Sequence, residues 1–197
     1  TVIVHGVGMT DEDITDAARK VRGLVWCPTT NSYLLDAQLA IGRWRQEGTH
    51  VALGSDSTLT SERDLLDEIK QGRQCAGCDS DCVSQAVSNR AAAILGLQNA
   101  GHLKANAYAD WTATSSKFGR LRRSTNDLIV TGGVPHIGNP DVMAKFPHIE
   151  TVDATLDGVP KRIHLDLARR IHQCRLKEPG LEVDVLPRKK FWIGRKA

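Results

Sequence analysis

The sequence predicts an α/β protein whose first half alternates strands with helices and whose second half is rich in short strands. Three apolar runs of three or four residues end in small or polar residues and are separated by segments of helical periodicity. Buried parallel strands have this composition because helices cover both faces of their sheet. From about residue 100 the pattern changes to short strands separated by turns. We therefore expect a β/α domain at residues 1–98 and a β-rich domain with a C-terminal helix and tail at residues 99–197.

In the first domain each strand is followed by a helix, the pattern of repeated βα units. Thr10 is the expected N-cap of the first helix, because Asp13 at the third helical position completes a variant of the capping box. Gly23 ends that helix, and Gly48 ends the next one. The expected strands are residues 2–4, 24–27 and 51–53, and the expected helices are residues 11–22, 34–46, 61–70 and 83–97.

The second domain contains two turn signals, Gly132-Gly133 and Asp157-Gly158, each between strand-like runs. The expected strands are residues 109–114, 127–131, 134–137, 151–156 and 159–163. Residues 165–176 form a basic amphipathic helix, for which docking onto the β domain is favoured over a membrane surface. The tail after Pro179 is expected to be irregular.

Polar side chains follow the strands of the first domain. Right-handed crossovers would make the three strands parallel, which places His5, Asn31 and Asp56 at one carboxyl edge. That edge is where α/β proteins place ligands and catalytic groups. A carboxylate there suits a metal or a substrate, although Asp56 could instead cap the following helix and His5 could be purely structural.

Three closely spaced cysteines, Cys75, Cys78 and Cys82, are a second candidate site. A Cys-x-x-Cys pair fits zinc or an iron–sulfur cluster, but structural zinc takes four ligands. The same residues could form a loop that binds nothing, or belong to a redox or radical protein. An absence of iron–sulfur absorbance would exclude the radical alternative.

Charge, hydropathy and cysteine usage limit the functional classes. The net charge of +3 is the balance of 26 basic and 23 acidic residues, too even to indicate a nucleic-acid partner. No apolar run approaches the roughly 18 residues of a membrane helix, so no membrane role is expected. Five cysteines without the spacing of small secreted proteins favour a reducing, cytoplasmic location.

Five segments together resemble the amidohydrolase superfamily, in the branch of aminohydrolases and chlorohydrolases that includes cytosine-deaminase-like enzymes. The strongest pair is VWCPTTNSYL followed by VALGSDS, which resembles the usual Cys-Pro-x-Ser-Asn-x-x-Leu and Leu-Gly-Thr-Asp-Ser. A preceding HGVGMTDEDI matches the family's sixth strand, and SNRAAAILGL matches the helix after its eighth. GHLKANAYADW resembles the family's exit from the barrel, with Asn106 in place of the usual glycine. The segments are residues 25–34, 51–57, 5–14, 88–97 and 101–111.

The resemblance implies the C-terminal three βα units of a (β/α)8 TIM-like barrel, strands six to eight, followed by a small mostly-β domain. It implies hydrolysis of C–N bonds, by deamination or ring-amide or amidine hydrolysis, with water activated by one divalent metal, zinc or iron. In that family Asp56 would bind the metal and accept the water's proton, and His5 would hydrogen-bond the attacking water or the leaving group. Asn31 and Ser57 would support the substrate or the strand ends.

The chain departs from the family pattern because it contains no His-x-His pair, the motif that supplies most metal ligands. We therefore expect a fragment that is inactive without a complementing N-terminal half. The whole enzyme would act on a small-molecule substrate, and whether this chain alone holds the metal stays open. A homo-oligomer is the other expected assembly. The alternative is a non-catalytic half-barrel that binds a protein partner through its exposed edges. The substrate cannot be chosen from these residues.

Overall fold

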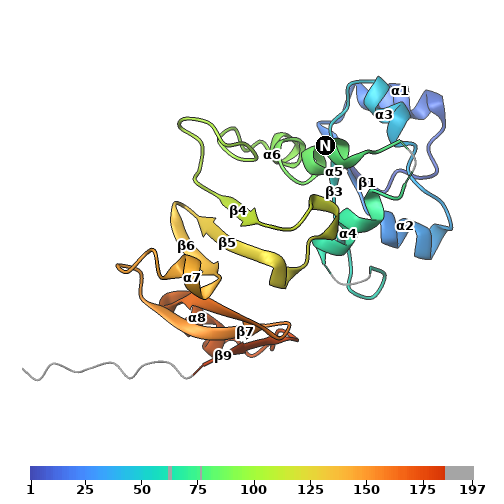
Figure 1. The fold of residues 1–197 in the computed structure, drawn as a ribbon. Helices are drawn as coiled ribbons and strands as arrows, with labels where there is room; N and C mark the ends of the chain where they lie inside the picture. The colour runs from blue at the N-terminus through green and yellow to red at the C-terminus, as the bar shows by residue number, and fades with distance from the viewer. Residues whose placement is uncertain (62–63, 76, 185–197) are drawn as a thin grey trace, which may run out of the picture. The chain divides into compact units, whose positions relative to one another are not determined.

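The structure is a computed structural model that describes residues 1–61, 64–75 and 77–184. These residues divide into two compact units (Figure 1), and each is described by itself. Unit 1 contains residues 1–110 and 116–122. Unit 2 contains residues 111–115 and the chain from residue 123 onward.

Unit 1 is built on a parallel sheet of three strands in the order β1-β2-β3, which confirms the expected parallel pairing. The strands are β1 (Val2–Val4), β2 (Gly23–Trp26) and β3 (Val51–Leu53). Val2 pairs with Gly23, and Leu24 pairs with Val51, so the three carboxyl ends lie at the same edge. Among the described residues, β1 and β3 each pair with a strand on one side only.

The helices of unit 1 are shorter and more numerous than the sequence predicts. Residues 34–46, expected as one helix, belong to two, because Asp36 takes a left-handed backbone (φ 47°) that ends the first of them. That first helix begins at Pro28, whose fixed φ suits the first helical turn. Likewise, two helices replace the one expected at residues 83–97. The helices are α1 (Asp11–Ala18), α2 (Pro28–Leu35), α3 (Ile41–Gln46), α4 (Leu65–Gly72), α5 (Ser80–Ala86), α6 (Asn89–Leu95) and the 3₁₀ turn η1 (Phe118–Arg120).

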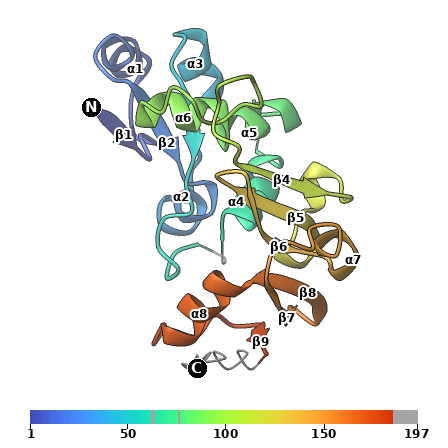
Figure 2. The ribbon, with the colours of Figure 1, turned by 90° about the vertical axis from the view of Figure 1, so that its left-hand side faces the viewer.

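The core of unit 1 lies between the sheet and these helices (Figure 2). Its largest members are Trp26 of β2 and Trp44 of α3, both fully buried. The inner face of α1 contributes Ile14, which is buried, and Ala17 and Ala18 pack against the same cluster. Thr10 caps this helix with the expected capping box, accepting a hydrogen bond from the Asp13 N–H. The N-cap and the capping box predicted for this helix are therefore confirmed.

Unit 2 is a six-stranded antiparallel sheet in the order β4-β5-β6-β8-β7-β9. The helix α8 covers part of it through Leu165 and Ala168. The tail expected to be irregular contains one strand, β9, and residues 185–197 lie outside the described residues. The elements are β4 (Trp111–Thr114), η2 (Arg123–Thr125), β5 (Asn126–Thr131), β6 (Val134–Gly138), α7 (Pro140–Met143), β7 (Thr151–Leu156), β8 (Val159–His164), α8 (Leu165–Gln173) and β9 (Leu181–Val183).

Lys161 lies inside unit 2 with only 2% of its surface exposed. Its ammonium donates hydrogen bonds to the Asn126 carbonyl and to Asn139 Oδ1, and burial lowers its pKa. These contacts tie β8 to β5, so Lys161 has a structural role there. In the described part of the chain, no helix combines the length and apolar character that crossing a membrane requires.

Candidate functional site

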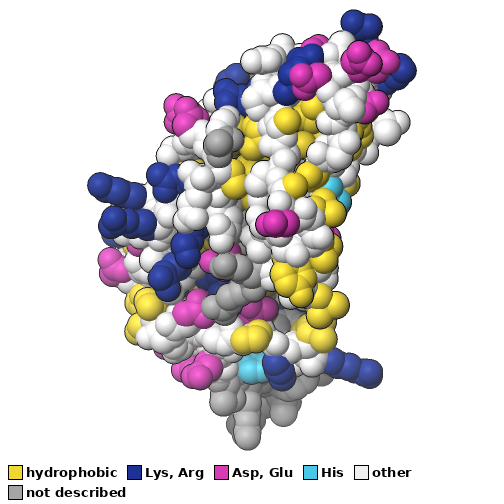
Figure 3. Space-filling view, turned by 90° about the vertical axis from the view of Figure 1, so that its right-hand side faces the viewer, with side chains coloured by type: hydrophobic (Ala, Val, Ile, Leu, Met, Phe, Trp, Pro, Cys, Tyr) yellow, Lys and Arg dark blue, Asp and Glu magenta, His cyan; other side chains and the backbone are white. Residues whose placement is uncertain are grey.

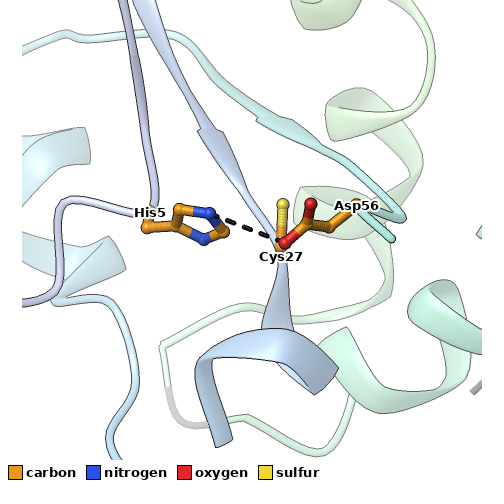
Figure 4. Close-up of side chains that lie close together, drawn as sticks. All are labelled: His5, Cys27 and Asp56. Carbon is orange, nitrogen blue, oxygen red and sulfur yellow. Dashed lines mark ion pairs between the residues drawn. The ribbon is translucent and has the colours of Figure 1, made fainter. Parts of the chain in front are cut away.

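Three side chains converge at the carboxyl edge of the parallel sheet, one from the end of each strand (Figure 4). His5 follows β1, Cys27 follows β2, and Asp56 lies three residues after β3. One ligand atom from each residue lies within 4.8 Å of the other two. The three groups are therefore close enough to act on one small ion or one reacting group.

The backbone at two of these positions is held in a conformation that non-glycine residues seldom adopt. His5 has φ 67° and Asp56 has φ 55°, both in the left-handed region. Hydrogen bonds between the strand ends hold the turns: the His5 N–H donates to the Val25 carbonyl, and the Gly54 N–H donates to the Trp26 carbonyl. Strain of this kind persists only where the surrounding fold imposes it, and it is concentrated at functional sites.

Asn31 of α2 orients the His5 ring. Its Oδ1 atom lies 2.9 Å from His5 Nδ1 and accepts a hydrogen bond when that nitrogen carries the proton. The Asn31 side chain is fully buried, so its position is fixed by packing. Because Nδ1 is engaged with Asn31, the Nε2 lone pair of neutral His5 is directed elsewhere.

His5 Nε2 faces the Asp56 carboxylate, with 3.6 Å between Nε2 and Oδ2. Both atoms are hydrogen-bond acceptors when His5 is neutral, so they repel unless a proton or a cation lies between them. The two side chains retain 35% and 33% exposure, which leaves the pair open to solvent. The confirmed proximity of His5, Asn31 and Asp56 thus forms a site that attracts a positively charged group.

The third group, Cys27, differs from its two neighbours because it is buried. Burial, together with the nearby charges of Asp56 and Glu68, raises the pKa of the Cys27 thiol to about 12. The thiol is therefore neutral near pH 7 when nothing cationic is near it. It lies at the N-cap position of α2, immediately before Pro28.

Two contacts from outside the cluster hold α2 in place. The buried carboxylate of Glu68 on α4 accepts a hydrogen bond from the Thr29 N–H, in the first turn of α2. An anionic group at this end of a helix is stabilised by the helix dipole. The Thr30 hydroxyl lies 3.0 Å from the Thr60 hydroxyl, which links α2 to the loop after β3. Both contacts fix the turn that carries Cys27 and the helix that carries Asn31.

A model of the amidohydrolase family matches residues 1–142, more than half of the chain. The chain belongs to the amidohydrolase family. This confirms the resemblance identified from the sequence motifs.

Two curated relatives of this amidohydrolase are 5-methylthioadenosine/S-adenosylhomocysteine deaminases. That of Thermococcus sibiricus is 27% identical over 134 residues, covering 64% of this chain and 31% of its own length. That of Haloarcula marismortui is 24% identical over 119 residues, covering 56% of this chain and 27% of its own length. The chain therefore spans less than a third of the length of these relatives.

Solved structures with the same fold include an adenosine deaminase from Xanthomonas campestris with bound zinc, at a TM-score of 0.58 and 18% identity. A Helicobacter pylori aminofutalosine deaminase in complex with methylthio-coformycin has a TM-score of 0.60 and 20% identity. Each match covers 68% of this chain and 36% or 37% of the other. At these identities the likeness shows the α/β fold and nothing finer.

The remaining residues proposed from the sequence lie elsewhere. The Ser57 hydroxyl accepts a hydrogen bond from the Leu59 N–H, a contact within its own turn. The three-cysteine cluster requires correction, because Cys78 and Cys82 are joined in a disulfide while Cys75 is a separate, half-buried thiol. Two of the three sulfurs are thus unavailable as thiolates. Both disulfide-bonded cysteines belong to the buried core of unit 1.

Cys27 and Glu68 were not proposed as site residues from the sequence. The sequence position of Cys27 is a signal that could have been used. Cys27 ends a predicted strand, between Trp26 and Pro28, just as His5 and Asp56 follow the other two predicted strands. Glu68 has none, because it lies on a helix 39 residues from its partner Thr29 and only packing brings them together.

The hydrogen bond to Asn31 predicts the tautomer of His5 in this amidohydrolase. Neutral His5 should carry its proton on Nδ1, which ¹⁵N chemical shifts of the ring nitrogens report directly. Asn31→Leu removes the acceptor and should lower the ratio of the Nδ1–H to the Nε2–H tautomer by up to about tenfold, since one net hydrogen bond contributes roughly 0.5–1.5 kcal/mol. Asn31→Asp keeps an acceptor oxygen and should retain the tautomer. A proton found on Nε2 in the unaltered protein would contradict this assignment.

Proposed function

We propose that this chain supplies the water-activating edge of a metal-dependent amidohydrolase that hydrolyses C–N bonds. The observation that carries the proposal is the pair of acceptor atoms, His5 Nε2 and Asp56 Oδ2, facing each other at 3.6 Å on the carboxyl edge of a parallel sheet. The Asp56 carboxylate is a ligand type that suits zinc, and His5 Nε2 lies where it can hydrogen-bond a water beside that carboxylate. Asp56 therefore fits a divalent metal such as zinc or iron as one of its ligands.

Each side chain then has a distinct role. A bound divalent metal supplies a Lewis acid that lowers the pKa of water towards about 7 in favourable zinc sites. Asp56 would hold the metal as one of its ligands and, as general base, would accept the proton of the attacking water and pass it on to the departing nitrogen. His5 orients the water or the leaving group through Nε2. Asn31 keeps Nε2 directed at that position by holding Nδ1.

The three βα units of unit 1 correspond, in this proposal, to strands six to eight of a (β/α)8 barrel. Three strands cannot close a barrel, so further strands from a longer chain, a complementing half or another copy would complete the pocket. In this proposal the antiparallel sheet of unit 2 is the small β domain that follows the barrel in the family. The complete enzyme would bind a small-molecule substrate at the carboxyl edge, where His5 and Asp56 lie.

Deamination of a purine nucleoside is the reaction that the named relatives favour. The test uses the protein purified from its source cells, incubated with zinc and adenosine, 5′-methylthioadenosine or S-adenosylhomocysteine, with ammonia release as the readout. We expect release that a chelator abolishes and zinc restores. A native protein of 21.5 kDa that releases no ammonia from any of the three would remove the support for this function.

A non-catalytic binding module is the second candidate, favoured by apolar side chains on the surface of α2. Tyr33, Leu34 and Leu35 are all more than half exposed, and hydrophobic side chains gather on the face shown in Figure 3. Soluble monomers seldom expose neighbouring apolar groups without a partner. A binding module would form a stable complex whether or not metal is present, whereas the hydrolase requires metal for turnover.

A further inference from the structure

A cavity open to solvent lies in unit 1, away from the edge of the sheet that carries His5 and Asp56. Its volume is about 690 Å³, within the roughly 300–1,000 Å³ of small-molecule sites. Its lining comes from Arg22, which precedes β2, and from α6 with the loop that follows it. We propose that this cavity binds a small organic anion, with a carboxylate or phosphate head group and a short apolar body.

The cavity is separate from the candidate hydrolase site. Arg22 stands immediately before the first residue of β2, at the amino edge of the parallel sheet, whereas His5 and Asp56 follow the carboxyl ends of their strands. The four residues of β2, each rising about 3.3 Å, separate the two edges. A ligand in this cavity therefore leaves the site proposed for hydrolysis unoccupied.

Arg22 supplies a positioned positive charge on the cavity wall. Its backbone N–H donates to the Thr1 carbonyl, and the adjacent Gly23 packs so closely on α6 that an added Cβ would be 2.4 Å from Ile94. Its guanidinium lies against Gly96, where an added Cβ would be 2.8 Å from Arg22 Nη1. The helix dipole favours a cation at this end of α6. Among the described residues the guanidinium has no hydrogen-bond or ion-pair partner, so it is available to a ligand.

Two glycines shape the loop that forms the rest of the wall. Gly96 ends α6 with a left-handed backbone (φ 76°), which turns the chain back along the helix. Gly101 then packs against the start of α6, where an added Cβ would be 2.6 Å from the Ser88 carbonyl oxygen. The Tyr108 N–H donates to the Asn99 carbonyl at 2.7 Å and closes the loop. The hollow is therefore formed by the backbone itself and is present before a ligand binds.

The remaining polar groups of the lining suit an oxyanion. Among the described residues that line the cavity none is acidic, and the Asn89 and Gln98 amides add N–H donors. His102 Nδ1 lies 2.9 Å from the Ala100 carbonyl, which can only accept, so Nδ1 carries a proton and Nε2 is left for a ligand. The planar guanidinium of Arg22 matches both carboxylate and phosphate in a bidentate manner. One positive charge without a negative one favours an anion over a neutral or cationic ligand.

Apolar side chains on the same wall indicate that the ligand has more than a head group. Ala93, Leu95 and Leu97 line the cavity, and the two leucines are 70% and 48% exposed. Covering them with an apolar body removes both surfaces from water, which is favourable. An inorganic anion held by Arg22 alone would leave these side chains uncovered.

Titration of the ¹⁵N-labelled full chain, followed by amide NMR shifts, tests the proposal and locates the ligand. The probes are phenyl phosphate and benzoate, which share a ring and differ in head group. Inorganic phosphate and phenol represent the head group and the ring alone. Arg22→Gln removes the charge, and Arg19→Gln is its matched control, because Arg19 is an exposed C-cap residue of α1 outside the lining. Ala93→Leu narrows the cavity from an exposed helical position, and circular dichroism checks the fold of each variant.

We expect at least one ring-bearing anion to shift the amides of residues 95–102 saturably, with a Kd of about 1 mM, as suits so small a probe. Inorganic phosphate and phenol should bind at least about tenfold more weakly. Arg22→Gln should weaken binding by at least about tenfold, the size of a lost charge-assisted hydrogen bond, and Arg19→Gln should leave it unchanged. Ala93→Leu should weaken the ring-bearing probes. The tighter of phenyl phosphate and benzoate identifies the head group, and equal binding assigns the site to either oxyanion.

Three outcomes would overturn the proposal: no saturable shift at these residues, binding that survives Arg22→Gln, or equal weakening by Arg19→Gln. Inorganic phosphate binding as tightly as phenyl phosphate would overturn the apolar part of the ligand assignment. The ammonia assay reports on the opposite edge of the sheet, so the hydrolase proposal and this one can each fail without the other.

Discussion

Trp26→Ala is expected to lower the free energy of unfolding of unit 1 by about 3–5 kcal/mol, the usual cost of deleting a large buried aromatic side chain. Trp26 is fully buried on the central strand, and its indole ring lies close enough to Gly72 of α4 that an added Cβ there would be 3.2 Å from it. The substitution also removes the indole N–H that donates to Gln38 Oε1. Far-ultraviolet circular dichroism during urea unfolding measures the change.

Trp111→Ala is the matched control for this prediction. Trp111 lies on the edge strand β4 of unit 2 and is 38% exposed, so its loss leaves a much smaller cavity. A small domain is stable by only about 5–15 kcal/mol, so the Trp26 variant should lose much of that reserve. A loss of less than about 1 kcal/mol in the Trp26 variant, no larger than that in the Trp111 variant, would contradict the role given to Trp26 in the core.

The parallel sheet of unit 1 could be predicted because its signals are local. Each strand is a short apolar run that ends at small or polar residues, and the rule of right-handed crossovers then fixes the strand direction. That rule alone places His5 and Asp56 at one edge although 51 positions separate them. The cap of α1 could be predicted for the same reason, since Thr10 and Asp13 act within one helical turn.

The helix boundaries after β2 could not be predicted because they depend on backbone conformations that several residue types allow. Asp36 ends α2 in a left-handed conformation that asparagine or glycine would have signalled more strongly. The expected helix begins only at residue 34, yet residues 28–33 are already helical, and Glu68 satisfies the Thr29 N–H in their first turn. That contact is tertiary, so the local sequence carries no trace of it.

For a related reason, only some of the residues at the site could be predicted from the sequence. Asn31 and Asp56 follow predicted strands and have polar side chains, which marks them as candidates. Cys27 ends a predicted strand, but it is apolar in character, so its position alone does not distinguish a site residue from a core residue. The close spacing of the three cysteines does not indicate a metal site, because Cys78, which precedes the N-cap of α5, forms a disulfide with Cys82 in the first turn of that helix.

Asp56→Asn is expected to reduce metal-dependent ammonia release by about 10²- to 10⁴-fold, the typical contribution of a general acid–base group. The amide occupies the same space and tolerates the left-handed backbone at this position, so the fold should be unaffected. What is lost is the carboxylate that faces His5 Nε2 and that, in the proposed function, takes the proton from water. The measurement is the initial rate of ammonia release by the zinc-loaded protein from its source cells.

Asp36→Asn is the matched control, because Asp36 is the other exposed aspartate of unit 1 with a left-handed backbone and it lies at the C-cap of α2. It should retain the full rate. If both substitutions reduce the rate equally, the effect of Asp56→Asn comes from the turn and not from proton transfer. If neither does, Asp56 is neither the base nor a required metal ligand, and the proposed function loses the support of this residue.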